Sequence, residues 1–108
     1  MKTEKVLLGY VAVDSGMLIV TDPCYLKMFN NNEGSIEKTP DGEYSYLGCC
    51  KATLSPDQGG QLMFETGNDG AGVAFSTGVG DGYYPVYAEY VESWGRRIGR
   101  ITIEFFEE

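Results

Sequence analysis

The chain has 108 residues, of which 43% are hydrophobic, and its 16 acidic and eight basic side chains give a formal net charge of −8. This length fits one globular domain spanning residues 1–108, and the negative charge disfavours nucleic acids and anionic membranes as partners, because both bind clustered positive charge. The sequence contains no histidine. Its absence excludes Ser-His-Asp and Cys-His catalysis and disfavours most zinc sites.

Short runs rich in Val, Ile and Tyr, separated by Gly, Asp, Asn or Pro, predict an all-β domain. Residues 5–13 and 17–22 are expected to form a hairpin around the turn "DSG", with Pro23 ending the second strand. The first of these runs faintly resembles a signal peptide, but Glu4 lies in the part that should be basic and no small-residue cleavage pattern follows, so we interpret it as a strand.

The polar segment 26–41, with three consecutive asparagines, predicts a surface loop with room for one short helical turn. Residues 42–54 are then predicted to be a long strand, in which Cys49 and Cys50 point to opposite faces and do not bond to each other. Three cysteines do not indicate a secreted disulfide framework, and no apolar run approaches the ~20 residues of a membrane span. We therefore expect a cytoplasmic protein.

Residues 61–66 and 71–77 predict a second hairpin around "NDG", and residues 83–91 and 97–106 predict a third around "ESWG". Alternation along the last strand puts Ile101, Ile103 and Phe105 on one face, which we predict to be the core face. The tyrosines of the preceding strand alternate between both faces, so one set should also lie in the core. About seven antiparallel strands predict a single-domain β-sandwich, with a small β-barrel as the alternative.

Three blocks of sequence occur in a recognisable order: "DSGMLIVTDPCYL", "TPDGEYSY", and "GAGVAFSTGVGDGYYPVYAEY" followed by "RIGRITIEF". Together they resemble a family of uncharacterised domains of bacteria and phages, one of the domain-of-unknown-function families. The resemblance extends from Asp14 to Phe105, and the chain departs from the pattern in being short between Leu54 and Gly70. It implies a shared fold and assigns no activity, ligand or site.

The stretch "STGVGDGYYPVY", residues 76–87, surrounds Asp81 with glycines. A phosphate-binding loop would need a following lysine and helix, and a dinucleotide fingerprint would need a third glycine in place, so we predict a tight turn instead. Exposed aromatic side chains beside this turn would suit a protein or carbohydrate partner. The candidate binding residues here are Gly80, Asp81, Gly82, Tyr83, Tyr87 and Trp94.

Asp22 and Asp81 each lie at a strand end beside a Pro or Gly turn. The favoured interpretation is that both cap turns; the alternative is a shared divalent-metal or carboxylate-dependent hydrolytic site. No spacing of acids matches a twelve-residue calcium loop, so we predict no metal and no cofactor. Cys24 is expected to pack as a small hydrophobic residue, because no histidine is present to activate it.

The basic cluster Arg96, Arg97 and Arg100 is expected on the solvent face of a strand. Taken together, the sequence predicts a small acidic binding or accessory protein rather than an enzyme. Its partner is expected to be another protein, or a second copy joined through an unpaired edge strand as a homo-oligomer. The identity of any small-molecule ligand stays open.

Overall fold

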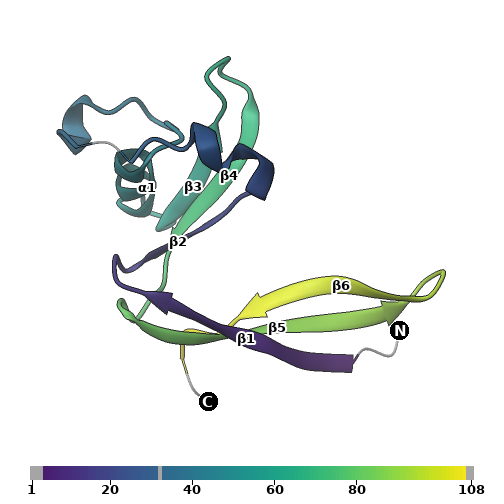
Figure 1. Ribbon diagram of the computed structural model, residues 1–108. Helices are drawn as coiled ribbons and strands as arrows, with labels where there is room; N and C mark the ends of the chain where they lie inside the picture. The colour runs from purple at the N-terminus through teal and green to yellow at the C-terminus, as the bar shows by residue number, and fades with distance from the viewer. Residues whose placement is uncertain (1–3, 32, 107–108) are drawn as a thin grey trace.

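The computed structural model describes residues 4–31 and 33–106 and contains two three-stranded antiparallel sheets with one α-helix (Figure 1). The long sheet has the strand order β1-β5-β6, and the short sheet has the order β2-β4-β3. Neither sheet closes into a barrel, so the predicted antiparallel sandwich class is confirmed over the small β-barrel.

The elements follow one another along the chain as three strands of the short sheet enclosed between strands of the long one. In order they are β1 (Glu4–Val13), β2 (Met17–Val20), the 3-10 helices η1 (Pro23–Met28) and η2 (Ile36–Lys38), α1 (Tyr46–Thr53), β3 (Gly59–Met63), β4 (Asp69–Ser76), β5 (Gly82–Glu92) and β6 (Arg96–Ile103). The two predicted hairpins are confirmed as β3–β4 and β5–β6. The second turns at "ESWG" as predicted, but the first turns at residues 64–68, and Asp69 and Gly70 of "NDG" already belong to β4. The predicted end of the second strand at Pro23, where η1 begins, is also confirmed.

The strand predicted over residues 42–54 is wrong, because most of this segment forms α1. The Ser45 side chain caps the helix by accepting a hydrogen bond from the Gly48 amide at 2.9 Å, which satisfies one of the free N–H groups of the first turn. Cys49 on the buried side of α1 packs against Leu62 and Ala74 of the short sheet. Burial against this sheet, rather than the alternation of side chains, decides the local structure.

The hairpin predicted around "DSG" is also wrong, although Gly16 has the expected positive φ of 71°. Instead of pairing with each other, β1 pairs with β5 and β2 pairs with β4. The turn passes the chain from one sheet to the other, and its Gly16 carbonyl accepts a hydrogen bond from the distant Thr77 amide at 3.0 Å. A partner 61 residues away in the sequence thus replaces the local one.

The core face predicted for the last strand is confirmed only at its end. Phe105 contacts the rings of Tyr84 and Phe75, with centroid distances of 5.2 and 6.3 Å, and so joins the two sheets. Ile101 on the same face is 49% exposed, and the long sheet extends away from the body formed by α1 and the short sheet (Figure 1). Among the described residues, no helix is both long and apolar enough to cross a membrane.

Candidate functional site

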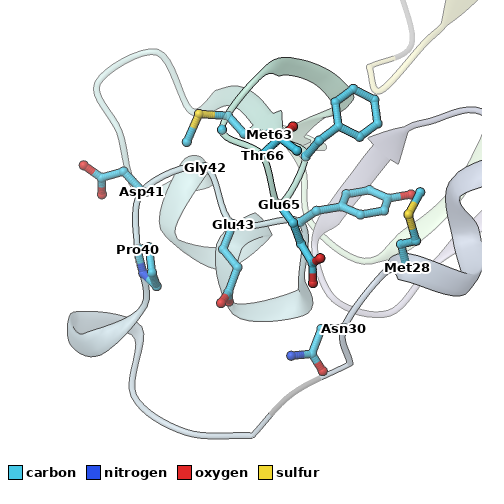
Figure 2. Close-up of a pocket in the computed structure, with 12 residues that line it drawn as sticks. Met28, Asn30, Pro40, Asp41, Gly42, Glu43, Met63, Glu65 and Thr66 are labelled. Atoms are coloured by element: carbon cyan, nitrogen blue, oxygen red, sulfur yellow. The ribbon is translucent and has the colours of Figure 1, made fainter.

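A pocket of about 630 Å³ lies where the end of η1, the segment before α1 and the β3–β4 hairpin meet (Figure 2). Its volume is in the range of ~300–1,000 Å³ that is usual for ligand sites. The lining residues come from three stretches of the chain: Met28 and Asn30; Pro40, Asp41, Gly42, Glu43 and Tyr44; and Met63, Phe64, Glu65, Thr66 and Gly67.

Backbone hydrogen bonds hold the middle stretch between the other two. The Asn30 amide donates to the Tyr44 carbonyl at 3.2 Å, and the Tyr46 amide donates back to the Asn30 carbonyl at 2.9 Å. On the other side, the Met63 amide donates to the Gly42 carbonyl at 2.7 Å. The backbone at the floor of the pocket is therefore fixed from both sides before any ligand binds.

Aromatic side chains make the inner wall rigid. The buried Tyr44 places its hydroxyl 2.7 Å from the Thr21 hydroxyl, which in turn donates to the Ala71 carbonyl at 2.7 Å. Because the single Thr21 proton is used on Ala71, Tyr44 is the donor in its bond to Thr21. Phe29 meets the Tyr44 ring edge to face at 5.0 Å. This wall is apolar toward the pocket and carries its polar group on the far side.

Three carboxylates surround the opening. Asp41 is paired with Lys51 at 2.8 Å, on the outer rim. Glu43 accepts a hydrogen bond from the Ser45 hydroxyl at 2.6 Å, which ties this acid to the N-terminus of α1. Its negative charge is favourable there, because the first turn of a helix carries a partial positive charge.

The third acid, Glu65, is exposed on the β3–β4 hairpin, and its side chain has no ion-pair or hydrogen-bond partner within residues 4–31 and 33–106. Figure 2 shows the carboxylates of Glu43 and Glu65 and the side chain of Asn30 extending to the same side of the pocket. No lysine or arginine is among the described residues that line it. The pocket is thus acidic at its opening and apolar at its wall.

The sequence-predicted residues of the stretch 76–87 lie elsewhere, in the turn between β4 and β5. The Gly80 carbonyl accepts hydrogen bonds at 2.6 Å from both the Thr77 and the Tyr84 hydroxyls. Gly78 and Gly80 have positive φ values of 73° and 108°, which glycine adopts without strain. The turn therefore holds the two sheets together, and Gly82 begins β5 directly after it.

The predicted aromatic residues do not form one patch. Tyr83 is exposed and stacks on Tyr10 at 5.6 Å, and the Tyr87 ring lies under the Lys5 ammonium at 4.5 Å. Trp94, almost fully exposed, lies beyond the other end of β5. At ~3.3 Å per residue, the length of β5 puts Trp94 about 35 Å from Tyr83, so the two do not contact one partner group together.

Asp22 and Asp81 lie at opposite ends of β2. Asp22 follows the strand and caps η1, its carboxylate accepting a hydrogen bond from the Cys24 amide at 2.9 Å. Asp81 lies beside Gly16, the residue that immediately precedes β2. The structure does not bring these acids together, and within the described residues no group of three His, Cys, Asp or Glu side chains could hold a metal ion.

The cysteines differ in their surroundings. Burial, and second the neighbouring Cys50 thiol, raise the pKa of Cys49 to about 11. Cys24 is exposed, so the prediction that it packs as a small hydrophobic residue is wrong. η1 has no buried residue, so Cys24 lies on the surface with the rest of this 3-10 helix. Cys49 is instead the cysteine that packs in the core.

A sequence model of the family described as "Protein of unknown function (DUF4241)" matches residues 3–94. The chain belongs to this family. The DUF4241 match includes every residue that lines the pocket and ends before β6 begins. No curated protein and no solved structure matches the chain.

Sequence reasoning missed the pocket of this DUF4241 member, including Asn30, Glu43 and Glu65. A signal was present, because the block "TPDGEYSY" that supports the family resemblance contains Asp41, Glu43 and Tyr44. The incorrect strand prediction for this segment hid its significance. An α-helix beginning at Tyr46 would have placed the block at a helix N-terminus, where acidic side chains collect.

Proposed function

We propose that this DUF4241 protein is a binding domain whose pocket takes a basic side chain, lysine or arginine, from a protein partner. One observation carries the proposal: the pocket joins an apolar wall to carboxylates from two separate elements, Glu43 and Glu65, and no described lining residue is basic. A net charge of −8 would also attract a basic partner from a distance.

The chemistry of the wall favours lysine or arginine over a free metal ion. A long basic side chain buries its aliphatic stem along apolar surface and keeps its charged end near acids. Met28 and Met63 offer flexible apolar contacts for that stem, because unbranched thioether side chains adapt to irregular shapes. A hydrated cation would gain nothing from such a wall.

The test is a selection of random peptides displayed against the immobilised protein. We expect selected peptides to contain lysine or arginine next to an apolar residue. Their affinity for Glu65→Lys should fall at least about tenfold, because one reversed charge at the opening replaces attraction by repulsion. Glu65 is the right acid to change, since Glu43 also supports the helix cap.

Asp57→Lys is the matched control. It makes the same change of charge at an exposed residue in the turn after α1, outside the pocket. A general electrostatic effect would weaken binding equally in both variants. Selected peptides without basic residues, or equal affinities for the wild type and Glu65→Lys, would contradict the proposal.

A further inference from the structure

One face of the long sheet is apolar over its middle, and the Glu4–Arg96 ion pair bounds it at the end near the β5–β6 turn. Residues directly opposite each other in antiparallel strands share a face, and the register pairs Val6 with Ala88 and Ile101, Val86 with Ile103, and Tyr90 with Ile98. We call this the isoleucine face and define it as Val6, Val86, Ala88, Ile98, Ile101 and Ile103. It has the composition of a core surface.

The described residues of the short sheet pack on one end of the isoleucine face. Near the turn between β4 and β5, Phe105 packs on Tyr84 and Phe75 of the short sheet. Farther along, Ile98 and Ile101 are 52% and 49% exposed. In Figure 1 this part of the long sheet extends past the body made by α1 and the short sheet. An apolar sheet face normally packs on a second layer, which the described residues do not provide here.

The long sheet is neutral overall, whereas the rest of the protein is acidic. The long sheet with the residue that follows it carries four basic and four acidic side chains: Lys5, Arg96, Arg97 and Arg100, and Glu4, Glu89, Glu92 and Glu104. Three ion pairs join them within the sheet, Glu4 to Arg96, Glu89 to Arg100 and Lys5 to Glu104. Residues 14–81, by contrast, carry ten acidic and three basic side chains.

This distribution of charge favours a second copy of the chain as the partner that packs on the isoleucine face. Two copies repel each other through their acidic bodies, and an internally neutral sheet is the surface through which they can meet without that repulsion. A basic partner would find more favourable charge on residues 14–81 than on the long sheet. A two-fold interface uses the same patch on both copies, so a patch without net charge avoids repulsion between them.

We propose that the isoleucine faces of two copies pack together as a sheet-on-sheet homodimer. Three strands ~4.8 Å apart, over the stretch of β5 from Val86 to Tyr90 at ~3.3 Å per residue, give a face of about 16 by 14 Å. A face of roughly 220 Å² in projection is a little over a quarter of the ~800 Å² per partner in a standard interface. The dimer is therefore weak and forms with rising concentration. This interface is separate from the pocket, so its failure leaves the proposed function standing.

Sedimentation velocity on the full chain, from about 10 μM to about 1 mM, tests the proposal over a range suited to a weak interface. The mass should rise from 11.9 kDa toward twice that value. Ile101→Lys, and separately Ile98→Lys, should stay at 11.9 kDa throughout while their circular dichroism matches the wild type. Both positions are already half exposed, so the monomer tolerates the change.

Val73→Lys is the matched control, because it also changes a β-branched strand residue, 44% exposed, but on the short sheet. It should dimerise like the wild type. Raising NaCl from about 50 mM to about 500 mM should leave the dimer intact or strengthen it, since salt screens the repulsion between the acidic bodies. A wild type that stays monomeric, or a dimer that survives both isoleucine variants, would overturn the proposal.

Discussion

Replacing Gly48 by alanine should destabilise the protein, although the same change in an exposed helix stabilises it. Gly48 lies in the first turn of α1, shortly after the pocket residues Gly42, Glu43 and Tyr44. A Cβ there would lie 1.8 Å from the Glu43 carbonyl oxygen and 3.1 Å from the Ser45 hydroxyl oxygen. Since the first contact is a backbone atom, no side-chain rotation relieves it.

The change in the free energy of unfolding follows from two destabilising contributions and one stabilising contribution. Overpacking a fixed site costs about 1–3 kcal/mol, and an overlap this deep belongs at the upper end. Shifting the start of α1 also weakens the Ser45 cap, which contributes about 1 kcal/mol. Alanine returns about 1 kcal/mol through its better helix propensity. We therefore expect Gly48→Ala to lower the free energy of unfolding by about 2–3 kcal/mol.

Thermal unfolding followed by circular dichroism measures this change. For a domain of this size, about 2–3 kcal/mol corresponds to a decrease in Tm of roughly 10–20 °C. Gly9→Ala is the control, because a Cβ at Gly9 in β1 has nothing within 4 Å and should leave Tm nearly unchanged. A Tm for Gly48→Ala equal to or above that of the wild type would refute the packing argument.

Two further predictions concern the sheet junction and the buried thiol. Thr77→Val should lower the free energy of unfolding, measured in urea, by about 1–2 kcal/mol. The fully buried Thr77 hydroxyl donates to the Gly80 carbonyl at 2.6 Å, and valine leaves that carbonyl with one donor fewer. Unchanged stability would mean that this hydrogen bond contributes nothing. Burial raises the pKa of Cys49 to about 11 from an ordinary value of 9.0, so the folded state holds this proton more tightly than the unfolded state. The resulting stability is present below pH 9 and is lost as the pH rises from 9 to 11, and urea unfolding at several pH values should show a smaller loss in Cys49→Ala than in the wild type. Equal losses in the two proteins would show that Cys49 does not titrate differently on folding.

Local sequence signals predicted the parts of the fold that depend on neighbours in the chain. The β3–β4 and β5–β6 hairpins have short turns with positive φ at Gly67 and Gly95, and their strands contain β-branched or aromatic residues. β2 ends at Val20, and Pro23, which lacks a backbone donor and could not continue a ladder, begins η1. These features do not require knowledge of distant partners.

Distant partners decided what the sequence could not show. Gly16 has the backbone angle that a hairpin turn needs, yet its carbonyl pairs with Thr77 and the two flanking strands enter different sheets. The segment that begins at Tyr46 alternates like a strand, but the Ser45 cap and burial on the short sheet make it a helix. The pocket depends on both outcomes, which is why its acids were not predicted together.

The acidic pocket is tested most directly by chemical-shift mapping on the ¹⁵N-labelled full chain, with a lysine- or arginine-containing peptide from the selection. We predict that the shifts concentrate on the amides of Asn30, Gly42, Glu65 and Gly67, which line the pocket on its three sides. They should disappear in Glu65→Lys and persist in Asp57→Lys. Shifts that concentrate instead on β5 and β6, with the pocket amides unchanged, would contradict the account.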